Sequence, residues 1–215
     1  MKKTVLLSLI FAVIFAGCSD TKKHSKGVYM LLDTSGTHAS ELEKAQSILN
    51  ALLLTLNPLD TLAVARVDTQ SFDKKDIIAK VTFHHRPSIA NNQKRVFHNK
   101  IGNFISKVKK SPYTDFSGGI LQAVAYLNEA DPGNKFILIF SDLKEELKKG
   151  RQNDVPFQLG GFKVIALNVT TLRANIRDPI KYMERVEQWG NKIERCNGQW
   201  QVANDLDRLD HLFIE

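Results

Sequence analysis

The stretch YMLLDTSGTHASELEKAQ, residues 29–46, joins an apolar run to a helical pattern through a few small polar residues. The continuous apolar run 27–33 is typical of a strand that is covered on both faces of a sheet. Gly36 permits a tight turn after it. Apolar residues then recur at helical spacing until Pro58, at Leu42, Ala45, Ile48, Leu49 and Leu52. The stretch therefore predicts a strand, a turn and a helix, the repeating unit of an α/β sheet.

Strand and helix patterns alternate along the rest of the chain. Further strands are expected at 60–67, 76–83, 134–143, 162–169 and 199–203, and further helices at 91–110, 117–131, 178–195 and the C-terminus. The polar link between 60–67 and 76–83 is too short to contain a helix and favours an antiparallel hairpin. We therefore expect a doubly wound, mostly parallel sheet of about six strands, with one antiparallel edge strand and helices on both faces.

Polar side chains gather where these expected strands end. Asp33, Ser35 and Thr37 alternate after the first strand, so they can point to one spot. The segment 112–119 leads into the third helix, and Asp142 ends the strand that contains FILIF. Ligands of such sheets bind beyond the carboxyl ends of the strands. Hydroxyl and carboxylate oxygens without His or Cys suit Mg²⁺ or Mn²⁺, so the sequence predicts an oxygen-ligand metal site.

Several catalytic classes fit this pattern poorly. The Asp-Thr-Gly turn of aspartic proteases is excluded because Ser35 precedes Gly36 and a helix follows. A Ser35–His38 nucleophile pair lacks the surrounding elbow pattern, and an Asp-x-Asp phosphatase would need an acid at position 35. His84 and His85 are adjacent at a strand end and are expected to face opposite ways, which makes a poor zinc pair. No glycine-rich phosphate loop precedes a helix.

The polar residues resemble the metal-ion-dependent adhesion site of von Willebrand factor A domains, which combines Asp-x-Ser-x-Ser with a distant Thr and a distant Asp. Asp33 and Ser35 match the first motif, Thr114 matches the isolated Thr, and Asp142 matches the last Asp. Thr37 stands where the family has its final Ser, and Leu143 follows Asp142 where the family usually has Gly. The resemblance spans residues 27 to 213.

This resemblance implies that Ser35, Thr37 and Thr114 bind the ion directly or nearly so, and that Asp33 and Asp142 act through water or hydrogen bonds. An ion held mostly by neutral hydroxyls would accept an Asp or Glu of a partner protein. The purely structural alternative, in which these side chains cap helices and turns, stays open.

The N-terminal residues have a different character from the rest. Residues 1–17 combine Lys2, Lys3 and a short apolar run, which describes a secretory signal peptide. The following FAGCSD resembles a bacterial lipobox, with Cys18 as the lipidated residue and Phe15 where Leu is usual; an ordinary signal peptide is the alternative. Residues 18–26 would then be a lipidated tether and 27–215 the domain. The expected location is the cell envelope, on the outer membrane of a diderm host or the cytoplasmic membrane of a monoderm one.

The charge and cysteine content bear on two further properties, nucleic-acid binding and disulfide formation. Lys2 and Lys3 are the only charged residues in 1–17, so cleavage lowers the formal charge from +7 to +5. The basic face of helix 91–110 favours a solvated surface over a nucleic-acid site, and no nucleic acid is expected. Cys196 is the only cysteine besides Cys18, so a lipidated chain has no intrachain disulfide.

Three function classes remain. The first is a lipid-anchored module that binds a protein through a divalent ion, and the second is a metal-free scaffold or assembly subunit of an envelope complex. The third, a metal-dependent hydrolase, is disfavoured because only His38 and Asp115 could act as a nearby base. We therefore expect that the protein is not an enzyme.

Overall fold

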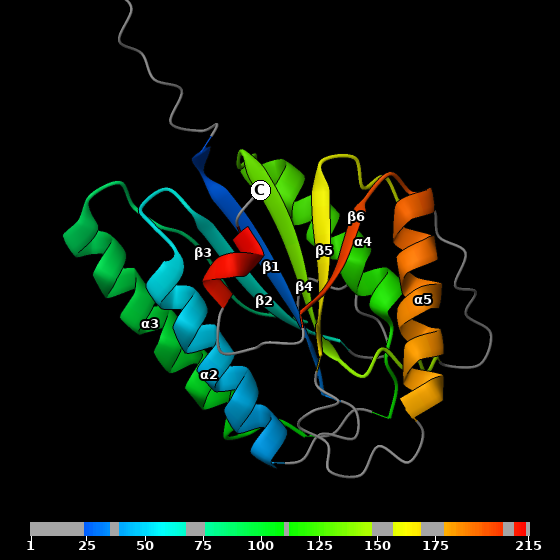
Figure 1. The fold of residues 1–215 in the computed structure, drawn as a ribbon. Coiled ribbons are helices and arrows are strands. Elements are labelled where there is room, and N and C mark those ends of the chain that lie inside the picture. The colour runs from blue at the N-terminus through cyan, green and yellow to red at the C-terminus, as the bar shows by residue number, and fades with distance from the viewer. Residues whose placement is uncertain are drawn as a thin grey trace, which may run out of the picture.

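The computed structural model describes residues 24–34, 39–67, 76–109, 112–147, 157–168, 179–203 and 209–213. Six strands form one sheet in the order β3-β2-β1-β4-β5-β6 (Figure 1). The strands are β1 (Lys26–Asp33), β2 (Thr61–Val67), β3 (Ile77–Thr82), β4 (Asn134–Ser141), β5 (Phe162–Asn168) and β6 (Gln199–Ala203). The helices are α2 (Ala39–Thr55), α3 (Pro87–Ile105), α4 (Phe116–Ala130), α5 (Pro179–Arg195) and the short 3₁₀ helix η5 (Leu209–Phe213).

All neighbouring strands are parallel except β2 and β3, which pair antiparallel. The predicted antiparallel edge strand is therefore confirmed, and the link between β2 and β3 lies outside the described residues. β1 lies inside the sheet, between β2 and β4, and is buried along almost its whole length. This position explains the continuous apolar run in its sequence, because both faces of an inner strand are covered.

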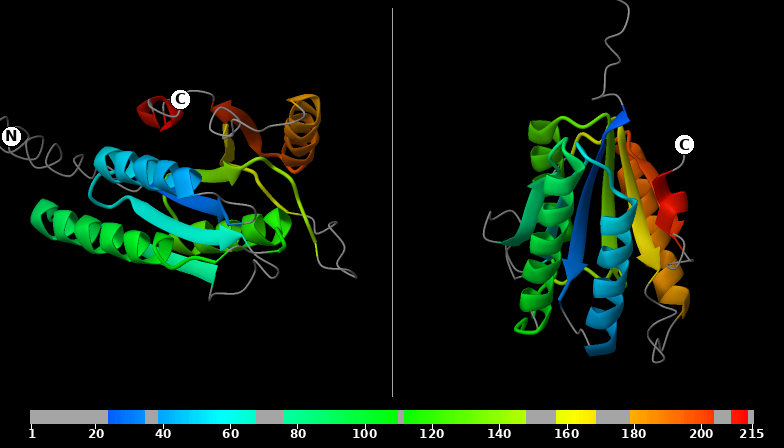
Figure 2. Two further views of the ribbon diagram at one scale, coloured as in Figure 1. Left: turned by 90° about the horizontal axis from the view of Figure 1, so that it is seen from below. Right: turned by 90° about the vertical axis from the view of Figure 1, so that its left-hand side faces the viewer.

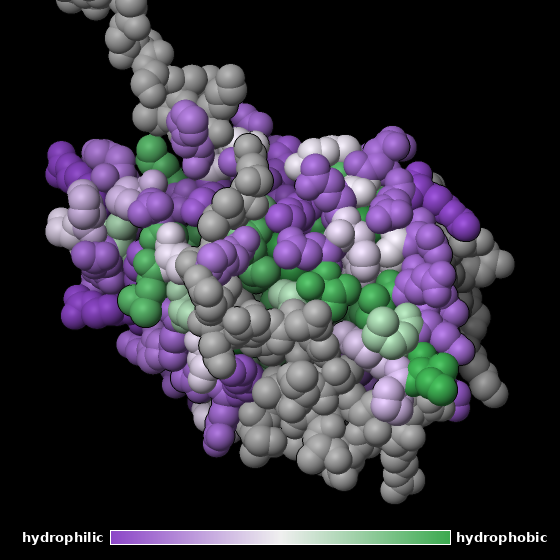
Figure 3. All heavy atoms as spheres, viewed as in Figure 1, coloured by the Kyte–Doolittle hydropathy of each residue, from purple (hydrophilic) through white to green (hydrophobic). Residues whose placement is uncertain are grey.

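Helices cover both faces of the sheet and form two cores. Val28, Met30 and Leu32 of β1 pack with α2, α3 and η5, whereas Tyr29 and Leu31 pack with α4 and α5. Figure 2 shows these layers from two further directions. In Figure 3, mostly hydrophilic residues cover the flanks formed by α3 and α5, and hydrophobic residues show between them.

Some element ends differ from the sequence prediction. α3 begins at Pro87, four residues before the predicted start at 91, because a proline fits the first turn of a helix, where its missing N–H is not needed. β4 ends at Ser141 because Leu143 has a φ of 62°, which breaks the extended chain. The C-terminal helix is a single 3₁₀ segment.

Several predicted features lie outside the described residues: the signal peptide 1–17, Cys18, Ser35, Gly36 and Thr37. Within the described ranges, no helix has the length and apolar character that a membrane span requires.

Candidate functional site

Asp33 lies at the carboxyl end of β1 and is buried, with 1% of its surface exposed. Its Oδ2 accepts a hydrogen bond of 2.6 Å from the hydroxyl of Ser141, the last residue of the neighbouring strand β4. The same hydroxyl oxygen accepts a bond of 3.0 Å from the N–H of Leu143. The carboxyl ends of β1 and β4 are therefore joined by side chains as well as by the ladder, and the Asp33 carboxylate is held in one orientation.

Thr114 lies just before α4 and is completely buried. Its backbone exchanges two hydrogen bonds, of 2.8 and 3.1 Å, with that of Glu146. Its side-chain oxygen, Oγ1, has no hydrogen-bond partner among the described residues. A buried hydroxyl without a partner costs about 1–3 kcal/mol. Such an oxygen is a suitable ligand position for a cation, so the residue present at this position fits the predicted site.

Asp142 follows β4 directly and keeps 19% of its side chain exposed. Its Oδ1 accepts a hydrogen bond of 3.1 Å from the N–H of Lys144. The guanidinium of Arg185, on α5, approaches Oδ2 to 4.0 Å, and its Nε donates to the Asp142 carbonyl oxygen at 2.9 Å. The Arg185 guanidinium therefore places a positive charge beside Asp142, which the resemblance predicts to act on the ion through water or hydrogen bonds.

The turn after Asp142 has the backbone geometry that a glycine favours. Leu143 adopts a φ of 62° although it is a leucine, and its side chain is 1% exposed. Trp189 of α5 donates from its indole N–H to the Leu143 carbonyl oxygen at 3.3 Å. The chain thus keeps a left-handed turn with leucine in place of the glycine that von Willebrand factor A domains usually have, and the buried side chain and the Trp189 contact offset the strain.

A group of charged residues beside this turn carries no signal in the sequence. Glu145 Oε1 accepts hydrogen bonds from the backbone N–H and the hydroxyl of Ser117, at 3.2 and 3.3 Å. The Lys192 ammonium donates to the Ser117 hydroxyl at 3.0 Å. Burial raises the pKa of the Glu145 carboxyl, and nearby Asp115 adds to the rise, whereas the Ser117 bonds and Lys192 oppose it. Asp115 caps α4, since its Oδ1 accepts from Gly118 N at 2.8 Å.

These contacts bring Asp33, Thr114 and the chain around Asp142 to the carboxyl edge of the sheet. Asp33 bonds to Ser141, the neighbour of Asp142, and Thr114 pairs with Glu146, four residues further on. Ser35 and Thr37 lie outside the described residues, so the complete ligand set stays a prediction. Sequence patterns did not indicate Ser141, because its role depends on the pairing of β1 with β4.

The expectation for the histidine pair is wrong in one respect. The rings of His84 and His85 do not face opposite ways; their centroids lie 4.1 Å apart. Both residues follow the last residue of β3, Thr82, so the alternation of a strand no longer applies to them. In the described ranges, no group of three or more His, Cys, Asp or Glu side chains could hold a metal.

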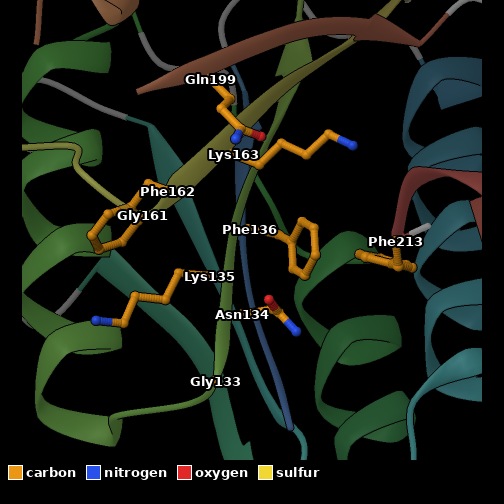
Figure 4. Close-up of a pocket in the computed structure, with 9 residues that line it drawn as sticks. All are labelled: Gly133, Asn134, Lys135, Phe136, Gly161, Phe162, Lys163, Gln199 and Phe213. Atoms are coloured by element: carbon orange, nitrogen blue, oxygen red, sulfur yellow. The ribbon is translucent and has the colours of Figure 1, made fainter. Parts of the chain in front are cut away.

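A cavity of about 520 Å³ lies at the opposite end of the sheet, near the amino ends of β4 and β5 (Figure 4). Phe136 and Phe213 form part of its wall and pack edge to face, with centroids 4.9 Å apart. Its two lysines have partners: Lys135 donates to the Asn128 side chain at 2.8 Å, and Lys163 lies 3.4 Å from the Leu212 carbonyl oxygen. Because the candidate ion site lies at the carboxyl edge of the sheet, this cavity is remote from it.

No protein-family profile matches the chain, and no curated protein matches it. Among solved structures, 37 chains match. A von Willebrand factor type A protein from Catenulispora acidiphila is similar over 88% of this chain, with a TM-score of 0.51 and 12% identity. The manganese-loaded TRAP protein of Plasmodium vivax matches 89% of this chain and 73% of its own, with a TM-score of 0.49 and 15% identity. The chain spans 41% of the length of the Catenulispora protein. Its fold is that of a von Willebrand factor A domain.

Proposed function

We propose that this chain is a lipid-anchored protein of the bacterial cell envelope, whose von Willebrand factor A-like domain binds a protein partner through Mg²⁺ or Mn²⁺. In this proposal Ser35, Thr37 and Thr114 offer hydroxyl ligands, and Asp33 and Asp142 orient them. The bound ion would supply a positive centre that a carboxylate of the partner completes. The role is recognition, without catalysis.

The observation that carries the proposal is the Thr114 hydroxyl. It is completely buried, has no hydrogen-bond partner among the described residues, and lies at the carboxyl edge where Asp33 ends its strand. Buried polar groups are nearly always satisfied, so this hydroxyl calls for a partner, and a bound cation is one that would fit. Threonine as a simple cap does not explain it, because the cap of α4 is Asp115.

A second candidate, a metal-free scaffold of an envelope complex, is favoured by one contact. The Arg185 guanidinium stands 4.0 Å from Asp142 Oδ2 and already supplies positive charge there. If this charge replaces the ion, the domain would recognise its partner through surface contacts alone.

Capture of envelope proteins on the immobilised domain separates the two candidates. With an ion-bridged partner, capture requires Mg²⁺, is lost in EDTA, and is lost when Asp33→Ala is used. The exposed Glu194 provides a matched control, and Glu194→Ala should capture as the wild type does. Capture that survives both EDTA and Asp33→Ala would support the scaffold instead.

The anchor has its own test. Cys18→Ser removes the only thiol that could carry the lipid near the N-terminus, so the protein should move from the membrane to the soluble fraction. Retention of Cys18→Ser in the membrane fraction would contradict lipid anchoring.

A further inference from the structure

Three cavities surround the outer side of strand β3 and meet at Lys80. Their volumes are about 670, 160 and 330 Å³. We call them together the edge groove. On one side α3 lines the groove with Gln93, Val96 and Lys100, and on the other side α4 lines it with Ala125, Tyr126 and Glu129. Within the described part of the chain β3 has a neighbour, β2, on one side only (Figures 1 and 2).

The register of β3 shows which backbone groups point into this groove. Phe83 N–H donates to the Asp60 carbonyl oxygen at 2.9 Å, so Phe83 faces β2. In an antiparallel pair, facing and outward residues alternate, so Val81 faces β2 and the N–H and C=O groups of Lys80 and Thr82 point outward. The Gln93 side-chain amide lies 3.4 Å from the Thr82 carbonyl oxygen, as a weak substitute for the N–H of an added strand.

The surroundings of the edge carry more positive than negative charge, although the carboxylate of Glu129 on α4 also lines the groove. Lys80 is exposed on the strand, with its ammonium 5.5 Å from the centroid of the Tyr126 ring. α3 contains Lys94, Arg95 and Lys100 and no acidic residue along its whole length. Lys94 is committed elsewhere, because it donates to the Leu56 carbonyl oxygen at 2.6 Å. The charges of Lys80, Arg95 and Lys100 outnumber that of Glu129 around the edge, and this balance favours an acidic occupant.

Apolar side chains line both sides of the edge as well. Val96 is 48% exposed on the α3 side although it is apolar. Ile77 and Tyr126 are partly buried against the core that lies under α4. Because side chains of an extended peptide alternate between the two faces of a sheet, an added strand would place its residues against α3 and α4 in turn.

We propose that the outer edge of β3 binds an extended acidic segment of a partner protein, which extends the sheet as a further antiparallel or parallel strand. A second copy of the chain is a poorer occupant, because pairing of two β3 edges would bring Lys80 and the nearby basic residues of both copies close together, where like charges repel. The proposal uses none of the ion-site residues, so its test is independent of the proposed ion-bridged function.

The probe is a fluorescein-labelled peptide of alternating valine and glutamate, about nine residues long and with blocked ends. Its affinity is measured by fluorescence anisotropy, and a peptide with lysine in place of glutamate is the control. The glutamate peptide should bind in EDTA, more weakly at high salt, and more tightly than the lysine peptide. Absence of glutamate-peptide binding, or equal binding of both peptides, overturns the proposal.

Variants of Lys80 separate charge from backbone pairing. Lys80→Pro removes an N–H that β2 does not use, so the fold should persist, and affinity should fall about tenfold or more. Lys80→Glu keeps the backbone and should weaken binding by repulsion, whereas the exposed Lys109→Glu serves as the matched control and should bind within about twofold of wild type. Thermal unfolding checks each variant.

Three results would contradict the proposal at this stage. One is folded Lys80 variants that bind the peptide as the wild type does. Another is self-association that Lys80→Pro abolishes, which would identify a second copy as the occupant. The third is tighter binding of a DNA oligonucleotide than of the glutamate peptide, with the same dependence on Lys80.

Discussion

Leu143 combines two opposing demands in one residue. Its φ of 62° lies in the left-handed region, which costs a leucine about 1 kcal/mol, while its side chain is almost fully buried. The burial of such a side chain stabilises by about 1.5–3 kcal/mol. Packing therefore exceeds strain, and the turn after β4 persists without the glycine that von Willebrand factor A domains usually have there.

This balance predicts an unusual order of stability for two truncations. At ordinary positions glycine is less stable than alanine, but at position 143 the backbone strain favours glycine. Both Leu143→Ala and Leu143→Gly should lose about 2–4 kcal/mol, and Leu143→Ala should be the less stable of the two. Urea unfolding measures both. The opposite order would show that the residue does not adopt the left-handed conformation in solution.

Glu145 predicts a pH-dependent contribution to stability. Burial raises the pKa of its carboxyl above the ordinary value of 4.5, so the folded chain binds this proton more tightly than the unfolded chain. The protonated Glu145 carboxyl therefore contributes favourably to the free energy of unfolding. This contribution is complete below pH 4.5 and is lost as the pH rises through the pKa of the folded state. The free energy of unfolding of Glu145→Gln, relative to wild type, should therefore increase from pH of about 4 to about 7. Urea titrations in EDTA at several pH values test this, and a constant difference would refute it.

At the scale of elements, two helical glycines differ in what surrounds them. In α4, a Cβ added to Gly118 would lie 2.6 Å from Asp115 Oδ2, the carboxylate that caps the helix. In α3, a Cβ at Gly102 would meet nothing closer than the Gln46 side-chain amide at 3.6 Å. The Asp115 cap therefore requires a glycine at position 118, whereas position 102 has room for a Cβ atom.

Gly118→Ala should therefore destabilise the protein by about 1 kcal/mol or more, because the new methyl displaces the capping carboxylate. Gly102→Ala should stabilise it by about 0.5–1 kcal/mol, because alanine is the better helix former. Thermal unfolding of the pair is the measurement. Equal effects of the two substitutions would contradict the role of Asp115 as the cap.

The elements themselves followed from local patterns, whereas the contacts between them did not. Continuous apolar runs predicted the inner strands, and the short link before β3 predicted the antiparallel edge, because both patterns reflect burial and connection length. Asp33 and Asp142 could be predicted as site residues because they end such runs, and the ion site itself stays a prediction. Arg185, Glu145 and Lys192 were missed, since they reach the site from separate elements and no spacing along the chain marks them.

At the scale of the whole molecule, the fold offers two separate surfaces. The carboxyl edge carries Asp33, Thr114 and Asp142, and the outer side of β3 carries the edge groove around Lys80. An ion-bridged partner at the first surface and an acidic segment at the second would not compete for the same residues. The central claim concerns the first surface and depends on one buried oxygen.

The most direct test is thermal unfolding of wild type and Thr114→Val with and without Mg²⁺. Valine keeps the shape of threonine and removes its unpaired hydroxyl, so the ion-free variant should be as stable as wild type or more stable. Mg²⁺ should raise the midpoint of the wild type and leave Thr114→Val unchanged. Thr55→Val is the control, since the Thr55 hydroxyl already donates to the Leu52 carbonyl oxygen at 3.0 Å. Thr55 is the last residue of α2, at the end of that helix away from Asp33. A wild type that does not respond to Mg²⁺, or a Thr114→Val variant that responds equally, would contradict the account.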